Sequence, residues 1–313
     1  MIDAGERKAL VELGGLLRAS EYAFTTITPL SHQRVCARQS PAQPTLRDVF
    51  GWSHSFRETD LSQNVFATLN KAGAAERAGE RFRSKVRYST LGDQLFVHSA
   101  FPTEEADAVF FGPDTYRFAR TIRSVDLGNL ADRPLILDVG AGTGAGGLYA
   151  ARILRHRSPQ IVLSDINERA LQFSAVNAAL NKVTNVSFVN SDLYAEIDGS
   201  FDLIISNPPY LVDARTRTYR HGGGEFGSGL SLRILQEGVP RLSRGGLLVL
   251  YTGTAIVRGV DPFRDAVLRL LQADSVSLTY EEIDPDVFGE ELEVSPYDRA
   301  DRIAVVAVVV RKL

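Results

Sequence analysis

The second half of the chain alternates short apolar runs with longer helical patterns. The apolar runs are rich in leucine and β-branched residues and cover residues 135–139, 160–164, 186–189, 203–205 and 247–251. Between them, stretches such as residues 168–181 carry apolar side chains at helical spacing. Continuous apolar strands separated by helices are typical of a parallel sheet that helices cover on both faces. We therefore predict an α/β fold.

Two further runs near the C-terminus change this pattern. Residues 276–280 and 303–310 are apolar or β-branched, and the segment between them is acidic with little helical character. Strands joined without a crossover helix pair as an antiparallel hairpin. The sequence therefore predicts a seven-stranded, Rossmann-like sheet whose last strand is antiparallel to the others.

The first third of the chain differs in kind. Helical patterns cover residues 5–20, 31–38 and 61–78, and residues 85–90 and 94–98 flank a Leu-Gly-Asp turn as hairpin strands. Helices followed by a two-stranded wing resemble a small winged-helix module. We expect a mainly helical N-terminal domain at residues 1–100, a connecting segment at 101–132 and an α/β domain at 133–313.

A glycine-rich loop follows the first strand of the α/β domain. Residues 138–144 read Asp-Val-Gly-Ala-Gly-Thr-Gly and lead into a helical pattern. Glycines there let the backbone turn tightly and approach a ligand closely. Because dinucleotide-binding folds use a related loop, the glycines alone do not specify the ligand.

Acidic residues end three successive predicted strands. Asp138 precedes the glycines, where its carboxylate would meet an ammonium group and repel a pyrophosphate. Asp165 can accept hydrogen bonds from ribose hydroxyls, and Asp192 can accept one from an adenine amino group. Each acid alone can also be a solvated strand end or a helix cap. Together they predict a site for an amino acid joined to an adenosine.

The fourth strand ends at the tetrapeptide Asn207-Pro208-Pro209-Tyr210. Proline fixes its own φ and restricts the residue before it, so Asn207 is held at the carboxyl edge of the sheet, where open α/β sheets bind ligands. The Asn207 amide oxygen and the Pro208 carbonyl can each accept a hydrogen bond from a planar N–H₂ group, and Tyr210 can flank that group. In isolation the tetrapeptide is equally compatible with a strand followed by a proline turn.

Composition narrows the class of protein further. The 313 residues carry a formal net charge of −3, which gives no overall attraction to nucleic acid or membranes. The one cysteine, Cys36, has no partner for a disulfide, and the five histidines show no metal-ligand spacing. The charged N-terminus lacks the apolar core of a secretory signal, and no segment is long enough to span a bilayer. We expect a cytoplasmic protein with no metal and no membrane partner.

From Val109 to the C-terminus, these motifs resemble the class I S-adenosylmethionine-dependent methyltransferases, and within them the N-methyltransferases with an Asn-Pro-Pro-Tyr motif. The glutamine N5-methyltransferases of protein release factors are similar and also have a helical N-terminal domain. Residues 111–115 look like the stretch that closes over the cofactor in such enzymes. The chain departs from that group at Gly112, where the group has a basic residue, and in the wing that ends its N-terminal region.

The resemblance implies S-adenosyl-L-methionine as cofactor and two sets of site residues. The cofactor-binding set is Pro113, Thr115, Asp138, Gly140, Gly142, Thr143, Gly144, Asp165, Ile166, Asp192, Leu193 and Asn207. The catalytic set is Asn207, Pro208 and Tyr210. It also implies that residues 1–100 recognise the substrate, that 101–132 carry a cofactor lid and that 133–313 form the catalytic domain.

We expect an enzyme that methylates an amide or amine nitrogen of a protein side chain or a small molecule. One alternative is a nucleic-acid methyltransferase acting on adenine N6 or guanine N2, with Tyr210 stacked on an extruded base and the arginine-rich residues 77–87 touching the polymer. A second is a non-enzymatic, cofactor-sensing protein, which would not need the tetrapeptide. The basic loop at residues 215–229 is a candidate lid whose arginines would meet an acidic or phosphate-bearing substrate, and His221 within it receives no catalytic role.

Overall fold

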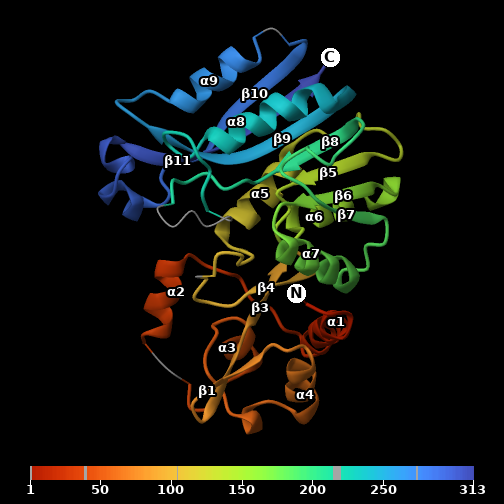
Figure 1. The fold of residues 1–313 in the computed structure, drawn as a ribbon, viewed down its shortest axis with the longest axis vertical. Helices are drawn as coiled ribbons and strands as arrows, with labels where there is room; N and C mark the ends of the chain where they lie inside the picture. The colour runs from red at the N-terminus through yellow and green to blue at the C-terminus, as the bar shows by residue number, and fades with distance from the viewer. Residues whose placement is uncertain (1, 39–40, 104, 214–219, 273) are drawn as a thin grey trace.

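The computed structural model describes residues 2–38, 41–103, 105–213, 220–272 and 274–313. A seven-stranded sheet organises the C-terminal part, in the order β10-β11-β9-β8-β5-β6-β7 (Figure 1). Its strands are β5 (Leu135–Val139), β6 (Gln160–Asp165), β7 (Val186–Asn190), β8 (Phe201–Ser206), β9 (Leu242–Ile256), β10 (Val276–Asp284) and β11 (Arg302–Lys312). Neighbours from β7 to β9 are parallel, whereas β11 runs antiparallel to both β9 and β10. This confirms the predicted sheet and its antiparallel last strand.

Helices cover both faces of this sheet. The helices are α5 (Pro113–Ser124), α6 (Ala145–Ile153), α7 (Glu168–Leu180), α8 (Gly229–Gly238) and α9 (Pro262–Leu270). Side chains alternate between the faces along each strand, so Ile136 packs with α5 and α6 while Leu137 packs with α8 and α9. The strands are therefore buried on both sides, as their continuous apolar sequence predicts.

The described residues of the N-terminal part form four α-helices and two hairpins. The helices are α1 (Ala4–Ala19), α2 (Pro29–Cys36), α3 (Leu46–Phe50) and α4 (Gln63–Lys71), and the strands are β1 (Ala75–Ala78), β2 (Arg81–Ser84), β3 (Val86–Leu91) and β4 (Gln94–Ser99). Short 3₁₀ turns occur in both parts of the described chain: η1 (Glu58–Asp60), η2 (Arg155–Arg157), η3 (Val239–Arg241), η4 (Gly289–Glu293) and η5 (Tyr297–Arg299).

The predicted helix over residues 61–78 was wrong beyond Lys71. Gly73 takes a left-handed φ of 61° after the helix end, and residues 75–78 pair with β2 instead.

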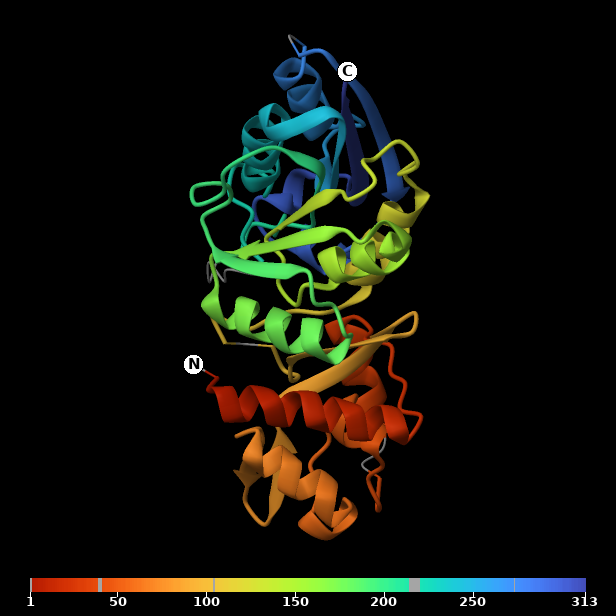
Figure 2. The same cartoon turned by 90° about the vertical axis from the view of Figure 1, so that its right-hand side faces the viewer.

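The N-terminal part packs against α7 of the C-terminal part. In the turned view of Figure 2, α1 (red) runs alongside α7 (green), and strand β4 of the β3–β4 hairpin contacts both helices. Leu10, Leu13 and Leu17 of α1 share one apolar cluster with Phe173 and Val176 of α7. All six residues of β4 are buried. The two parts therefore share a core.

One buried amide joins this hairpin to the glycine loop. Asn177 of α7 is fully buried, and its Oδ1 accepts a hydrogen bond from Val97 N at 2.7 Å. Its Nδ2 donates to the carbonyl oxygens of Val97 at 3.0 Å and Thr143 at 2.9 Å. The side chain thus satisfies backbone groups that a neighbouring strand would otherwise satisfy.

Replacing Asn177 by leucine is expected to lower the free energy of unfolding by about 3 kcal/mol. The leucine is similar in size but leaves three buried backbone groups without partners, and each such group costs about 1–3 kcal/mol. Urea unfolding measures the change. Asn129→Leu, at an exposed position, serves as control and should stay within about 0.5 kcal/mol of the parent. A loss below about 1 kcal/mol for Asn177→Leu would contradict this interpretation.

No helix within the described ranges is both long and apolar enough to cross a membrane.

Candidate active site

A cavity of 370 Å³ opens at the carboxyl ends of β5, β6 and β8. It gathers residues that are far apart in sequence, and most of the predicted site residues line it: Thr115, Asp138, Gly140, Gly142, Thr143, Asp165, Ile166, Asp192, Leu193, Asn207, Pro208 and Tyr210. Pro113 and Gly144 are not among the lining residues; they are the first residue of α5 and the residue preceding α6. One cavity therefore joins the glycine loop, the strand-end acids and the tetrapeptide.

The glycine loop leaves open space at two positions. Gly140 and Gly142 have left-handed φ values of 68° and 56°, and a Cβ built on either would meet nothing within 4 Å. At Gly144, by contrast, a Cβ would lie 3.0 Å from Leu163. Because Gly140 and Gly142 line the cavity, a side chain on either residue would occupy space that a ligand could fill.

Asp138 is buried at the floor of this cavity. Its Oδ2 accepts a hydrogen bond from Gly147 N at 2.7 Å, in the first turn of α6. Burial raises the pKa of this carboxyl to about 7, and the nearby Asp165 raises it further while the Gly147 hydrogen bond lowers it. A cationic ligand group would stabilise the ionised form.

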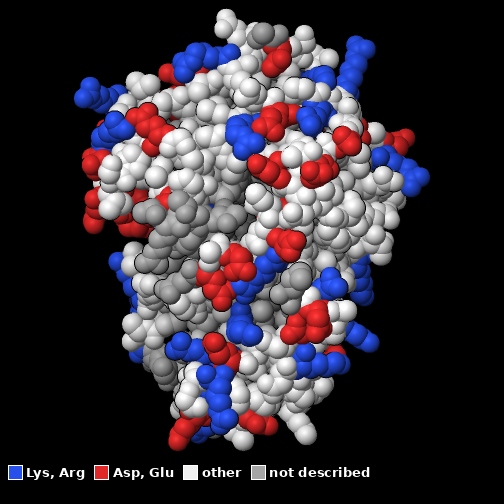
Figure 3. Space-filling view, in the orientation of Figure 1, with Lys and Arg blue, Asp and Glu red and all other residues white. Residues whose placement is uncertain are grey.

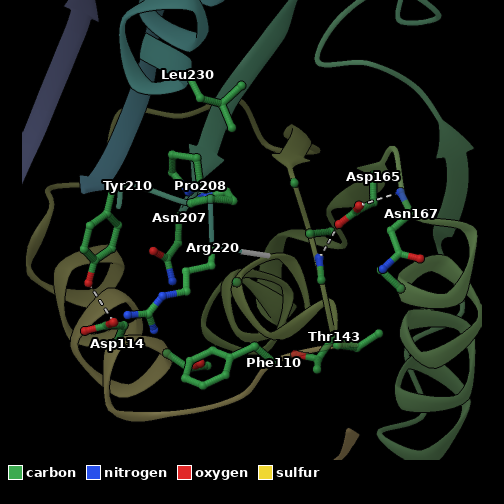
Figure 4. A pocket seen from close by; sticks show the side chains of 18 of the residues that line it. Phe110, Asp114, Thr143, Asp165, Asn167, Asn207, Pro208, Tyr210, Arg220 and Leu230 are labelled. Carbon is green, nitrogen blue, oxygen red and sulfur yellow. Dashed lines mark hydrogen bonds between the residues drawn. The ribbon is translucent and has the colours of Figure 1, made fainter. Parts of the chain in front are cut away.

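Asp165 is held in a fixed orientation at the end of β6. Its Oδ2 accepts from Gly142 N at 2.8 Å, and its Oδ1 accepts from Asn167 N at 2.9 Å. Burial raises the pKa of Asp165, and these backbone hydrogen bonds oppose the rise. The carboxylate therefore links the glycine loop to the start of α7, as the right side of Figure 4 shows.

The third acid is placed differently. Asp192 lines the cavity but is exposed, and its Oδ1 lies 3.6 Å from Arg233 of α8. The neighbouring Leu193 is buried at a left-handed φ of 51°, which a leucine adopts only under constraint. Ser191, which the sequence argument did not include, also lines the cavity.

Asn207 presents its amide to the cavity. Among the described residues no hydrogen bond to this amide is found, and in Figure 4 it points into the space between Tyr210 and Arg220. Pro208 is buried beside it and also lines the cavity. An amide that lacks a partner at a cavity wall is available to a ligand.

Tyr210 is anchored by its hydroxyl. The hydroxyl donates to Asp114 Oδ2 at 2.7 Å, and the ring lies edge-on to Phe288 with 6.0 Å between centroids. Gly253 leaves room for this ring, since a Cβ there would approach it to 2.3 Å. One side of the ring is thus covered by protein, while Tyr210 still lines the cavity.

Several lining residues lie outside the two predicted sets of site residues. They are Phe110, Asp114, Asn167, Arg220, His221, Leu230 and Phe288. Asp114 follows Pro113 in a motif already singled out, so its position could have been proposed. Phe288 lies between β10 and β11, and only the folded chain brings it to the cavity.

The basic loop after the tetrapeptide contributes two of these residues. Arg220 forms ion pairs with Glu291 and, at 3.6 Å, with Asp213, so its charge is already balanced by acids of the chain. Arg215 and Arg217, which were predicted to meet an acidic substrate, lie outside the described residues.

His221 also lines the cavity. Its Nδ1 accepts from Asp213 N at 3.2 Å, so the neutral imidazole carries its proton on Nε2. No catalytic role was predicted for His221, and that prediction stays open.

Comparison with known proteins places the chain in a class. A family model described as the methyltransferase small domain matches residues 126–252. Among solved structures, a complex of aTrm5 with tRNALeu shares the fold with a TM-score of 0.50 at 14% identity, over 75% of this chain and 56% of that one. The solved structure thus shares the Rossmann-like fold, and the family model matches a methyltransferase domain within it.

Curated relatives narrow this class. The release factor glutamine methyltransferase of Francisella tularensis subsp. tularensis is 32% identical over 227 residues, which cover 67% of this chain and 76% of that protein. The chain belongs to the methyltransferase family that includes the release factor glutamine methyltransferases. Other matches are shorter: the Deinococcus radiodurans enzyme of that name is 37% identical over 38% of this chain and 45% of its own length. The putative protein N5-glutamine methyltransferase MJ0928 of Methanocaldococcus jannaschii is 35% identical over 36% of this chain and 58% of its own.

Proposed function

We propose that this chain is an S-adenosylmethionine-dependent N-methyltransferase that methylates a side-chain amide of a protein, with a glutamine of a release factor as its substrate. The observation that carries this proposal is the Asn207 amide, to which no described residue forms a hydrogen bond and which lines the same cavity as the glycine loop and the strand-end acids. The names of the curated relatives indicate that those enzymes methylate a glutamine side chain of a protein, which is the source of the substrate in this proposal. We place this reaction in the cytoplasm, where release factors act in translation.

The cavity fits the proposed cofactor. The open space at Gly140 and Gly142 would let a ligand approach the backbone closely. The buried Asp138 carboxylate would be stabilised by a cationic group of the ligand. Asp138 would hold the ammonium group, Asp165 the ribose hydroxyls, and Asp192 with Leu193 the adenine. Thr115, Thr143 and Ile166 would complete the walls, with Pro113 and Gly144 shaping the backbone behind them. When bound, S-adenosylmethionine supplies a methyl group on a sulfonium, which is an activated leaving group.

The tetrapeptide would orient the acceptor. An amide nitrogen is a weak nucleophile because its lone pair is delocalised. Asn207 Oδ1 and the Pro208 carbonyl would each accept one N–H of the acceptor, which stabilises positive charge on the nitrogen and directs its lone pair into the cavity. Once methylated, the nitrogen would lose one of these protons to water. Tyr210 would flank the planar group. An amide also presents a carbonyl oxygen, and His221, which lines the same cavity, would donate a hydrogen bond to it through Nε2–H.

The N-terminal region would recognise the protein substrate. Pro29, at the start of α2, already lines the cavity, so residues 1–100 reach the site. The connecting segment at residues 101–132 would cover the cofactor through Phe110 and Thr115.

A nucleic-acid acceptor is not favoured. The arginine-rich stretch falls on β1, β2 and the start of β3, where Arg81 lies 3.7 Å from Asp60. On the face seen in Figure 3, basic and acidic side chains are interspersed. Electrostatic binding to a phosphate backbone requires a surface of one sign.

Cofactor affinity is expected to depend on pH through Asp138. Its pKa of about 7 exceeds the usual value near 4, so the carboxyl is largely protonated below pH 7, whereas an ammonium ligand prefers the ionised form. Calorimetric titration should therefore show about 20-fold weaker binding at pH 5.5 than at 7.5, with proton release on binding. Without ligand the sign reverses: the folded chain holds the proton that the unfolded chain loses near pH 4, so stability falls as pH rises from 4 toward 7.

Asp138→Asn is the matched control, because it keeps the shape of the side chain and removes the titration. It should bind the cofactor weakly at both pH values, with only the smaller slope due to Asp165 remaining. Equal affinity of the parent chain at pH 5.5 and 7.5 would contradict the role of Asp138.

The acceptor class is tested by competition. The chain is incubated with methyl-labelled cofactor and an equimolar mixture of a release factor and transfer RNA, and the two polymers are then separated. We expect label in the protein only. Label in the RNA would support the base methyltransferase instead, and cofactor binding without label in either polymer would support a sensor.

A further inference from the structure

We propose that Asp114 is a positioning residue that fixes the tetrapeptide 207–210 through the hydroxyl of Tyr210 and ties it to helix α5. The proposal rests on the proposed function, because it concerns how the acceptor site is held. It assigns a role to a residue that does not need to touch either substrate.

Both oxygens of the Asp114 carboxylate accept hydrogen bonds from buried tyrosines. Tyr210 donates to Oδ2 at 2.7 Å, and Tyr251 of β9 donates to Oδ1 at 2.9 Å. Asp114 itself is 8% exposed, and Figure 4 shows it below the Tyr210 hydroxyl. Hydrogen bonds to a carboxylate are about twice as strong as those between neutral groups. This carboxylate is therefore a firm anchor for both rings.

The anchor is fixed from a third direction by arginine. Arg117 Nη1 donates to Asp114 Oδ1 at 3.2 Å, and Arg117 Nη2 lies 2.9 Å from Asp284 at the end of β10. Asp114 thus belongs to a chain of charges that runs from α5 to the edge of the sheet. Its position does not depend on Tyr210 alone.

The tetrapeptide transmits the position of Tyr210 to Asn207. Two consecutive prolines separate the residues, and proline removes the freedom of φ at each position. Burial raises the pKa of Tyr210 well above its usual value, so the hydroxyl stays protonated and donates. A ring held at its hydroxyl therefore sets where Asn207 Oδ1 and the Pro208 carbonyl lie.

The same turn of α5 also reaches the cofactor side. Thr115 adjoins Asp114, lines the cavity, and accepts a hydrogen bond from Gly112 N through its Oγ1 at 3.2 Å. One helical turn thus contacts both halves of the site, so movement of α5 would shift the acceptor groups.

Two phenylalanine variants test this role. Tyr210→Phe and Tyr251→Phe each remove one buried hydroxyl from the same carboxylate, but only Tyr210 belongs to the tetrapeptide. We expect Tyr210→Phe to lower kcat roughly 10- to 100-fold with KM and cofactor Kd within about twofold. Tyr251→Phe should keep kcat within about threefold of the parent. Asp114→Asn should lower kcat by as much as Tyr210→Phe does. The double variant that combines Asp114→Asn with Tyr210→Phe should be no slower than the slower of these two single variants.

Crystal structures of the two variants supply a readout that does not need activity. In Tyr210→Phe we expect the Asn207 amide to move by about 1 Å, a shift large enough to slow catalysis, whereas in Tyr251→Phe it should stay in place. The proposal would be overturned if Asn207 stayed in place in Tyr210→Phe, or if Tyr210→Phe and Tyr251→Phe lost kcat equally. It would also be overturned if the kcat losses of Asp114→Asn and Tyr210→Phe multiplied in their double variant. A parent chain without transferase activity would overturn the proposed function instead, and the structures would still decide the positioning role.

Discussion

Replacing Asn207 by alanine is expected to lower the rate of methyl transfer at least about 1,000-fold while cofactor affinity stays within about threefold of the parent. The amide oxygen is one of two acceptors proposed to orient the substrate nitrogen, and removing one preorganised group of this kind costs about 100- to 1,000-fold in rate. Loss of orientation adds to this cost. Single-turnover kinetics with saturating cofactor measure the rate, and calorimetry measures the affinity.

One control variant and two possible outcomes test this role of Asn207. Asn129→Ala, at an exposed position outside the cavity lining, should leave both quantities unchanged. A rate within tenfold of the parent for Asn207→Ala would refute the assignment of the acceptor site. Equal losses of rate and cofactor affinity would make Asn207 a cofactor ligand only.

Valine at Gly142 is expected to weaken cofactor binding about 100-fold. The backbone at Gly142 is left-handed with a φ of 56°, and a side chain there would extend into the cavity. Steric overlap of this kind costs about 1–3 kcal/mol, which corresponds to a change in affinity of up to about 100-fold. Calorimetric titration of the folded variant measures it.

Gly79→Val is the matched control for this substitution. Gly79 lies in the β1–β2 turn with a φ of 64°, and a Cβ there also meets nothing within 4 Å. Both variants carry the same backbone strain, so their melting temperatures should fall by similar amounts. Only Gly142→Val should lose affinity, and equal affinities in the two variants would show that the loop does not contact the cofactor.

The sequence predicted the sheet and most of the cavity because both depend on local patterns. Continuous apolar runs predict the strands, and the glycines and the tetrapeptide lie at strand ends. The ends of parallel strands meet at one edge of a sheet. The site residues Asp138, Asp165 and Asn207 could therefore be placed together without knowledge of packing.

The remaining features depend on contacts between distant segments. Phe288 reaches the cavity only because β11 inserts between β9 and β10, and Asn177 joins β4 to the glycine loop through side-chain amide groups that have no sequence signature. The helix predicted through residue 78 was wrong because the apolar pattern was given more weight than the single glycine at position 73. The helix ends before Gly73, and residues 75–78 pair with β2 as strand β1. Asp114 lies in a motif that the sequence singled out, but no local pattern predicts that Tyr210 and Tyr251 donate hydrogen bonds to it.

The most direct test of the central claim is the identification of the methylated atom. A release factor is incubated with S-adenosylmethionine and either the parent chain or Asn207→Ala, and fragmentation mass spectrometry then locates the added methyl group. The parent chain should place one methyl group on the side-chain amide of a glutamine, and Asn207→Ala should leave that glutamine unmodified. A methyl group on another kind of residue, or an equally methylated glutamine with Asn207→Ala, would contradict the account.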